Sequence, residues 1–578
     1  MQDNKNILLA TVISAVILMG WTWLYEKPRM EKQAIVKEEI KKTTLTNDVV
    51  TNNVAANKAL DSSLIANKEP ALSLKSRSDI LQKTKNERLP IENDNLHGSI
   101  SLVGARFDDI TLAKYFEKID KKDEVILFAP ADSKERYFTD FGWISSDSSL
   151  DLPKPNTVWK SSDKKLTKEN PVTLSWRNNL GIEFLIHIKL DENYMFSIEQ
   201  EVKNHSGKEI SLASYGRVSR VLNMAQKPVY ILHEGAIGVL EGSLKESTYK
   251  DLIKEKKQTF NSSEGGWLGI TDKYWLSSII PDNNLKYIAD FSYESVNQNQ
   301  FFSSEFIGQE VKISKGENLK FSHHLFAGAK DVKLLDKYEK DYNIKRFDLA
   351  VDFGWFYFLT KPFYFVISFL NNLIGNFGLA ILAMTVLVKL ALFPMANKSY
   401  AAVAKMKLLQ PKIDVIREKF KDDKIAMNRE IMEFYKKEKI NPASGCLPIL
   451  IQIPVFFALY KVIFVTLDMR HASFYGWIHD LSAPDPTSLF NLFGLLPFSV
   501  SPSFTIGIWP ILMGITMIVQ QKLSPAVTDP TQAKILKWMP YVLTFVLAAF
   551  PAGLVIYWTW SNFLSILQQL AISKKKSS

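Results

Sequence analysis

A single lysine interrupts an apolar stretch of the chain. Residues 385 to 395 read TVLVKLALFPM, and Lys389 is the only charged residue among them. A charge near the middle of a membrane-spanning helix costs about 3 kcal/mol, so it usually faces protein or water and marks a functional site. The chemistry of such a site is electrostatic, because a fixed ammonium group attracts acidic and polar ligands. The alternative is that the lysine stem carries the ammonium toward the membrane surface.

Other apolar segments offer Lys389 neutral polar partners. Thr385 lies one helical turn before it, on the same face of a helix. The remaining polar candidates are Gln452, Thr516, Gln520, Gln521, Tyr557, Trp558, Thr559, Ser561 and Asn562. No Asp or Glu lies deep in these segments, so they hold no counter-ion for Lys389. A cation among hydroxyls and amides predicts a hydrated cavity rather than a dry ion pair.

Enzymatic chemistry has little support in the sequence. Cys446 is the only cysteine, the eight histidines are scattered, and a GxxxxGK[ST] phosphate loop is absent. His323 and His324 are adjacent, and on a strand they would point to opposite faces. We therefore expect no metal site, no cofactor, no catalytic residue and no intrachain disulfide.

The charge distribution favours a membrane surface as a partner. The net charge of +10 comes mostly from basic residues that flank apolar segments. This arrangement suits anionic lipids, and we expect no nucleic acid as a specific ligand.

Six apolar segments have the length of a bilayer-spanning helix. The first is expected in residues 1–25. Because no small-x-small cleavage site follows it promptly, an uncleaved signal anchor is favoured over a signal peptide. The other five are expected at 374–397, 447–468, 504–523, 535–550 and 552–572. Pro551 and Gly553 predict a tight turn that pairs the last two segments as an antiparallel hairpin.

Basic loops orient these segments. Residues 398–446 and the tail 573–578 are rich in Lys or Arg, which predicts that they and the 524–534 loop are cytoplasmic. Residues 469–503 carry Arg470 as their only fixed cation and are expected in the periplasm. Both termini are then cytoplasmic, although the basic residues that follow the first segment argue for the reverse orientation.

The 398–446 loop has a helical pattern of its own. Apolar residues recur at 3,4 spacing from Met406 to Phe420 and again from Met427 to Phe434, which predicts two paired amphipathic helices. Pro411 is expected to bend or interrupt the first. The hairpin is either a solvated structure or a docking surface for an incoming chain or a ribosome. The candidate docking residues, including those of the tail, are Lys405, Lys407, Lys412, Arg417, Lys574, Lys575 and Lys576.

The region after the first segment divides into three parts. Residues 26–94 lack glycine and aromatic residues and predict a disordered tether. In residues 95–345, alternating apolar residues from Ile182 to Leu190 and from Tyr194 to Ile198 indicate a hairpin and predict a large β-sandwich. Such a domain is either a scaffold or a carbohydrate-binding module. The aromatic-rich residues 346–373 predict an amphipathic helix in the membrane interface.

These segments resemble the YidC family of bacterial membrane protein insertases, which has mitochondrial and chloroplast relatives. The resemblance is carried, in order over residues 350–572, by VDFGWFYFLTKP, GNFGLAI, KMKLLQPKIDVIREKFKDDK, KINPASGCLPILIQIPVFFALY, WIHDLSAPDP, ILMGITMIVQQKLSP and FPAGLVIYWTWSNFLSILQQ. Two earlier stretches, DNKNILLATVIS and EGGWLGITDKYWLSSIIP, are similar to the Gram-negative form with its large periplasmic β-domain.

The resemblance implies a fold and an activity. The fold is a membrane α-helical bundle of six transmembrane helices, with a five-helix insertase core, plus a large periplasmic all-β sandwich domain. The activity is insertion and assisted folding of nascent inner-membrane proteins, alone or beside the Sec translocon, through a hydrated groove open to the cytoplasm and to lipid. The family's groove cation is typically arginine, and the matching position here is Lys389. Thr385, Gln521, Tyr557 and Trp558 match groove-lining or contact positions.

Two other classes of function remain open on the sequence. A polytopic transporter or channel would show paired ion-coupling residues or internal repeats of broken helices. An envelope carbohydrate-binding protein would instead act through the β-domain.

Overall fold

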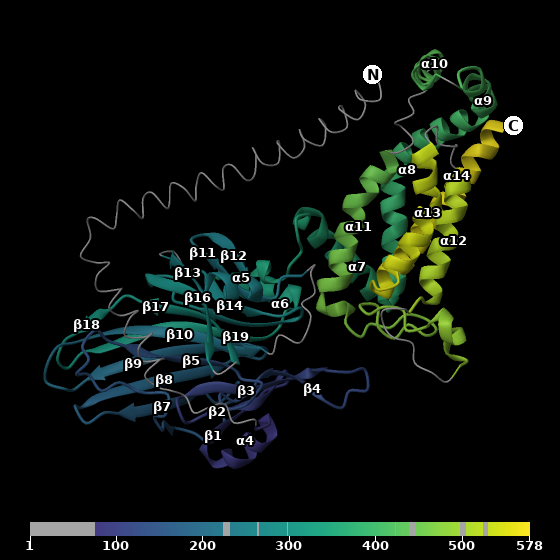
Figure 1. Cartoon of the computed structure of the whole chain (residues 1–578). Coiled ribbons are helices and arrows are strands. Elements are labelled where there is room, and N and C mark those ends of the chain that lie inside the picture. The colour runs from purple at the N-terminus through teal and green to yellow at the C-terminus, as the bar shows by residue number, and fades with distance from the viewer. Residues whose placement is uncertain are drawn as a thin grey trace, which may run out of the picture. The chain divides into compact units, whose positions relative to one another are not determined.

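Figure 1 shows the computed structural model, which describes residues 75–222, 232–262, 265–296, 299–421, 423–438, 447–496, 505–523 and 530–577. The predicted signal anchor and most of the predicted tether lie outside these residues. The chain divides into two compact units, Thr46–Asp352 and Phe353–Ser578 together with Met1–Leu45, and each is described by itself.

The first unit contains two antiparallel sheets (Figure 1). The larger follows the order β1-β2-β3-β5-β10-β17-β16-β13, with β4 beside β3 and β18 beside β10. Its strands are β1 (Arg88–Glu92), β2 (Leu96–Ser101), β3 (Arg106–Phe116), β4 (Glu124–Phe128), β5 (Tyr137–Ile144), β10 (Ile210–Leu222), β13 (Lys257–Ser262), β16 (Tyr287–Val296), β17 (Asn299–Gly308) and β18 (Val311–Ile313).

The second sheet follows the order β12-β11-β14-β15-β19-β9-β8-β7-β6. Its strands are β6 (Lys160–Ser161), β7 (Val172–Arg177), β8 (Ile182–Leu190), β9 (Met195–Asn204), β11 (Gly235–Leu240), β12 (Ser243–Thr248), β14 (Trp267–Thr271), β15 (Trp275–Ile280) and β19 (Asn318–Ala329). Among the described residues of this unit, three α-helices accompany the sheets: α4 (Arg77–Lys83), α5 (Tyr249–Glu255) and α6 (Val332–Asp341).

Buried aromatic rings join the two sheets. Phe107 of β3 contacts Phe196 of β9, with ring centroids 5.3 Å apart. Phe141 of β5 stacks on His323 of β19 at 6.4 Å, and all four side chains are buried. His324, the next residue, is half-buried, as expected for neighbours on a strand. The predicted all-β domain with two packed sheets is confirmed.

The β8–β9 hairpin forms where the alternating pattern predicts it. Leu190 pairs with Phe196, and Ile182 pairs with Asn204 at the far end. The Asp191 side chain accepts hydrogen bonds from the backbone N–H groups of Asn193 (2.8 Å) and Met195 (2.9 Å), which fixes the turn.

The prediction of a disordered tether over residues 26–94 is wrong for its C-terminal part, which forms a helix and a strand. Helix α4 (Arg77–Lys83) begins after Ser76, whose hydroxyl accepts from the Asp79 N–H while Asp79 bonds back to the Ser76 backbone. Strand β1 then adds to β2 and buries Leu89 and Ile91. A segment too polar for a core of its own can still form an edge strand, because the neighbouring sheet supplies the apolar surface.

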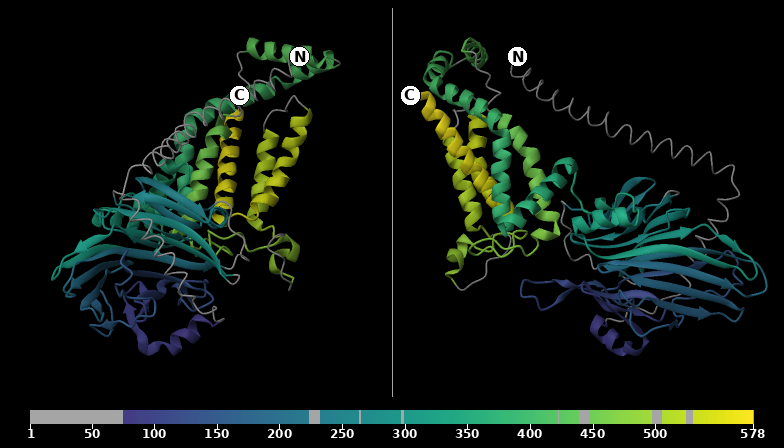
Figure 2. Two further views of the ribbon diagram at one scale, coloured as in Figure 1. Left: turned by 60° about the vertical axis from the view of Figure 1, so that its left-hand side comes forward. Right: turned by 180° about the vertical axis from the view of Figure 1, so that it is seen from behind.

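The second unit is helical, and most of its helices run side by side in one bundle, with α9 and α10 beyond one end of it (Figure 2). They are α7 (Tyr357–Ile374), α8 (Phe377–Leu408), α9 (Gln410–Lys419), α10 (Lys424–Lys437), α11 (Leu447–Val465), α12 (Ile508–Leu523), α13 (Pro530–Leu547) and α14 (Ala552–Ser577). Within the described residues, α8 alone is long and apolar enough to cross a membrane, and Gln452–Val465 of α11 is a shorter apolar helix. The helical region is thus confirmed, and six transmembrane helices remain a prediction.

Several predicted boundaries change. The interfacial helix predicted over 346–373 begins only at Tyr357, after Gly354 adopts a φ of 70°. Helix α8 continues to Leu408, past the predicted span end at 397, because the residues there include good helix formers such as Ala401 and Ala402. The predicted basic tail 573–578 instead continues α14 to Ser577.

Helix α14 lies at the centre of the contacts in this unit. It packs against α8, α11 and α12. The last two segments turn at Pro551, where a tight turn is predicted. Both α13 and α14 pack against α12. A buried cluster of Met513, Leu547 and Val555 joins these three helices.

The predicted cytoplasmic hairpin consists of α9 and α10, which contact each other. Pro411 lies at the start of α9, where a missing backbone N–H is tolerated.

Candidate functional site

A stripe of polar residues runs along α14. Tyr557, Ser561, Ser565 and Gln569 are each four residues apart, so they lie on one face of the helix. All four are buried, as is Asn562 beside them. Buried hydroxyls and amides need hydrogen-bond partners, and this stripe obtains them from neighbouring helices and from its own backbone.

Lys389 of α8 reaches this stripe. Its side chain is half-buried, and its ammonium donates a hydrogen bond of 2.8 Å to Ser565 Oγ. The Ser565 hydroxyl in turn donates to the Ser561 carbonyl at 2.9 Å. Within the described residues, Lys389 forms no ion pair with a carboxylate. A neutral hydroxyl leaves the positive charge uncompensated and available to an incoming anion.

Ser565 itself is absent from the sequence-derived candidates. Its signal was available, because it lies four residues after Ser561 and therefore on the same helical face. The sequence-derived candidates also lack a second lysine that lies within an apolar segment. Lys461 lies near the end of α11, where the same criterion of a charge within an apolar run would have found it.

Two further hydrogen bonds link the stripe to other helices. The Gln452 amide of α11 donates to the Tyr557 hydroxyl, and the Asn562 amide donates to Thr516 Oγ1 of α12 at 3.2 Å. Trp558 is half-buried, and its ring meets Phe456 of α11 edge-to-face with centroids 4.6 Å apart. Three helices, α8, α11 and α12, thus converge on the polar face of α14.

Thr385 and Gln521, the other two predicted groove residues, differ in burial. The Thr385 side chain is 1% exposed, and its hydroxyl donates to the Ile381 carbonyl of its own helix at 2.7 Å. Thr385 is therefore buried among the helices, as Tyr557 is, and its part in the groove stays a prediction. Gln521 is half-buried near the C-terminal end of α12.

The predicted docking residues divide into two groups. Lys405, Lys407 and Lys412 are exposed, and Lys407 donates to the Lys522 carbonyl at 3.4 Å, beside the end of α12. Arg417 is half-buried and pairs with Asp414 at 2.9 Å. The side chains of Lys574, Lys575 and Lys576 lie outside those that the structure describes.

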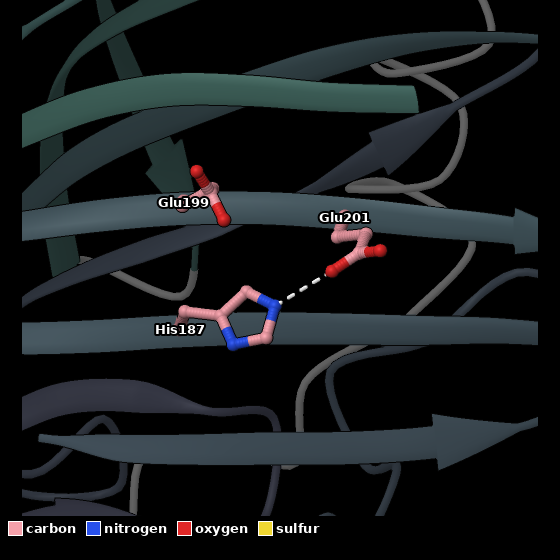
Figure 3. A group of neighbouring side chains, drawn as sticks. All are labelled: His187, Glu199 and Glu201. Atoms are coloured by element: carbon pink, nitrogen blue, oxygen red, sulfur yellow. Dashed lines mark hydrogen bonds and ion pairs between the residues drawn. The ribbon is translucent and has the colours of Figure 1, made fainter. Parts of the chain in front are cut away.

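Among the described residues of the β-domain, one cluster has metal-ligand chemistry; Figure 3 shows its side chains. His187 Nε2 lies 2.8 Å from Glu201 Oε2, and Glu199 pairs with His187 across the β8–β9 ladder. Lys320 reaches Glu199 at 2.8 Å and Glu201 at 3.7 Å, and the Glu199 carboxylate raises the pKa of Lys320. Because this ammonium already compensates the carboxylates, the cluster has the character of a surface ion-pair network. Sequence analysis missed it, although the hairpin register places these residues on one face.

Comparison with known proteins covers nearly the whole chain. Residues 88–366 match the family model of the YidC periplasmic domain, and residues 369–578 match that of the 60Kd inner membrane protein. Two curated relatives, both described as membrane protein insertase YidC, are each 47% identical. The Rickettsia bellii protein aligns over 571 residues, 98% of each chain, and the Rickettsia massiliae protein over 570 residues, 98% of this chain and 99% of that one.

A solved structure is also similar. A crystal structure of an active YidC insertase, with its first transmembrane domain resolved, matches 90% of this chain and 98% of that one, at 16% identity and a TM-score of 0.35. The length and identity of the sequence matches decide the assignment. This chain belongs to the YidC family of membrane protein insertases, proteins of the bacterial inner membrane that are not enzymes.

Proposed function

We propose that this insertase receives the polar part of a nascent membrane protein in a hydrated groove beside Lys389. The groove opens to the cytoplasm and to lipid and is closed toward the periplasm. The chain spans the membrane six times with both termini in the cytoplasm. The transporter and carbohydrate-binding alternatives are not favoured, because the relatives are insertases over their full length.

The observation that supports this mechanism is the environment of Lys389. Its ammonium is half-buried against the hydroxyl of Ser565, and the neighbouring stripe on α14 is polar but uncharged. A cation held this way attracts a carboxylate on a substrate tail without competition from an internal one. Polar side chains of four helices also provide the hydrogen bonds that water or a peptide backbone requires.

Insertion then requires no bound cofactor. A substrate segment of about 20 apolar residues gains enough free energy from lipid to enter the bilayer. The barrier is the transfer of its attached polar segment across hydrocarbon. A hydrated groove shortens this path, and the attraction to Lys389 draws acidic tails into it. The apolar segment leaves sideways along the helices.

Cytoplasmic partners are proposed from charge. Lys405, Lys407 and Lys412 are exposed beside the α9–α10 hairpin. Basic residues at this position suit ribosomal RNA surfaces and anionic lipid headgroups, both of which are negatively charged. We propose that the ribosome docks here during synthesis, and that the Sec translocon acts beside the bundle for larger substrates.

Site-specific crosslinking tests this function. A photoreactive amino acid at Trp558 should crosslink to a ribosome-bound nascent membrane protein, because Trp558 lies on α14 near the polar stripe. Phe563, which is exposed on the same helix, provides the matched control for contact with lipid-facing segments. Crosslinks from Trp558 should include the polar tail of the substrate, whereas those from Phe563 should not. Equal labelling of the tail from both positions would contradict the groove.

A further inference from the structure

An apolar loop precedes α12 and has no place in the mechanism above. It comprises residues 489–496, LFNLFGLL, and no residue from Pro486 to Leu496 is charged. Its exposed side chains are Leu489, Phe490, Leu492, Phe493, Leu495 and Leu496. Leu495 is 83% exposed. Contiguous exposed apolar side chains of this kind mark an interaction surface.

The backbone of the apolar loop satisfies much of its own hydrogen bonding. The N–H groups of Leu489, Phe493 and Leu496 donate to the carbonyls of Ile506 (2.9 Å), Ser488 (2.7 Å) and Asn491 (3.1 Å). The Phe490 N–H donates to Ser488 Oγ at 3.3 Å. Hydrocarbon offers no water to a backbone donor, so a segment that enters it must bond internally. A loop in water has no such requirement and would turn apolar side chains inward.

The conformation of the loop directs apolar side chains outward at a cost. Leu492 and Phe493 are consecutive residues in the left-handed region, with φ of 50° and 59°. This region is unfavourable for residues with a Cβ atom, and branched or bulky side chains rarely occupy it. Both side chains are nevertheless exposed, at 50% and 41%. A strained backbone that exposes apolar side chains indicates that contacts with another molecule compensate the cost of the strain.

A buried carboxylate fixes the start of the loop. Asp485 accepts hydrogen bonds from Trp477 Nε1 (3.1 Å), the Thr487 N–H (3.0 Å) and the Trp509 N–H (3.0 Å). The last of these lies at the N-terminus of α12, where backbone donors lack partners within the helix. The apolar loop is therefore held at the end of α12 and cannot fold back freely.

We propose that the apolar loop inserts into the outer leaflet of the inner membrane, with lipid acyl chains as its partner. The inference rests on the proposed topology, in which α11 and α12 cross the membrane and the connection between them lies in the periplasm. A loop that precedes α12 and follows α11 then lies at the periplasmic surface of the bilayer. Lipid fits this loop better than a protein partner does, because its exposed side chains are uniformly apolar and protein interfaces have a polar rim.

Spin labelling of the full-length protein in lipid vesicles tests the inference. Cysteine is introduced at Leu495 in a Cys446→Ser background, and nitroxide accessibility to oxygen and to a water-soluble nickel complex is compared. His479, an exposed polar residue earlier in the same connection, is the matched control. Leu390 of α8, 61% exposed within an apolar helix, reports on the transmembrane arrangement itself.

The three labels separate the possible outcomes. We expect the oxygen-to-nickel ratio at Leu495→Cys to approach that at Leu390→Cys and to exceed that at His479→Cys severalfold. A lipid-like ratio at Leu390→Cys with a water-like ratio at Leu495→Cys would overturn the inference and leave the proposed function intact. A water-like ratio at Leu390→Cys would overturn both. Low accessibility of Leu495→Cys to both reagents would indicate a protein partner, such as a second copy, and would also overturn the inference.

Discussion

The nature of the cation matters most at the scale of single residues. Lysine at position 389 is a compact charge that donates to Ser565, whereas the resemblance implies arginine, with its planar fork, elsewhere in the family. Attraction to an acidic tail needs only the charge. Bidentate recognition of a carboxylate needs the fork, so this protein should select substrates by charge rather than by geometry.

Substitutions at Lys389 measure this attraction. Lys389→Arg should leave insertion nearly unchanged, while Lys389→Ala should slow insertion of a substrate with an acidic tail about fivefold, the effect of losing an interaction of roughly 1 kcal/mol. Lys389→Glu should slow it further by repulsion. A substrate with a neutral tail of equal length is the control. Equal rates for all variants on both substrates, measured by protease protection in proteoliposomes, would refute the assignment.

His323 gives the β-domain a defined response to acid. Burial between the sheets, with a smaller contribution from His324, lowers the pKa of His323 from 6.5 to about 3. The Asp282 N–H donates to its Nδ1 at 3.3 Å, which fixes the neutral form. As pH falls from about 6.5 toward 3, the unfolded chain binds a proton that the folded domain excludes. The free energy of unfolding should therefore fall by up to about 1.4 kcal/mol per pH unit.

His323→Asn tests this contribution, because asparagine keeps an acceptor but does not titrate. Thermal unfolding of the β-domain within the full chain, followed between pH 7 and pH 5, should show a weaker loss of stability with acid in the variant. His324→Asn, at the half-buried neighbouring position, is the control and should change the pH dependence less. Identical pH profiles for wild type and His323→Asn would contradict the prediction.

At the scale of single elements, sequence patterns predicted some strands and helices correctly and missed others. The period-2 pattern located β8 and β9, and Asp191 explains their turn. The pattern failed for β1, since an edge strand with only two buried side chains resembles a polar linker. It also failed for helix ends such as Leu408, because a helix stops where capping and packing change rather than where apolar residues end. The polar stripe on α14 was identified in part, since its partners depend on how helices pack.

The connection before α12 should depend on Asp485. Asp485→Ala removes the buried acceptor that Trp477, Thr487 and Trp509 share, which should lower the free energy of unfolding by roughly 1–3 kcal/mol. Asp485→Asn keeps one oxygen and should cost less. Thermal unfolding in lipid nanodiscs provides the measurement. A stability of Asp485→Ala equal to that of Asp485→Asn would show that the oxygen that asparagine keeps contributes nothing, and would contradict this role of Asp485.

At the scale of the whole molecule, the two units differ in the physics that forms them. The β-domain buries its aromatic residues between two sheets, whereas the helical unit exposes large apolar residues such as Leu390 and Phe369. Composition alone predicted this division, because alternating short segments and long apolar runs suit different solvents. It did not predict the hydrogen bond from Lys389 to Ser565, which joins helices distant in sequence. It also did not predict the ion-pair cluster around His187, which depends on the register of the β8–β9 hairpin and on Lys320 of β19.

Removal of residues 60–330 tests which unit carries the activity. The sites proposed for insertion all lie after Phe353, so the remaining chain should retain most of its insertion activity in cells depleted of the native protein. Growth and insertion of a reporter protein are the readouts, with Lys389→Glu in the shortened chain as the negative control. Complete loss of insertion, with the shortened protein present at normal levels in the membrane, would assign the activity to the β-domain instead.

The central claim is that water reaches Lys389 from the cytoplasm. The most direct test places a cysteine at position 389 in the Cys446→Ser background and measures its reaction with a charged thiol reagent added to inside-out membrane vesicles. Leu390→Cys, one residue away at a position that is 61% exposed and that we expect to face lipid, is the control. We predict that Lys389→Cys reacts much faster than Leu390→Cys, and that an arrested substrate with an acidic tail slows this reaction. Equally slow reaction at both positions would show that Lys389 lies among dry, packed helices and would contradict the mechanism.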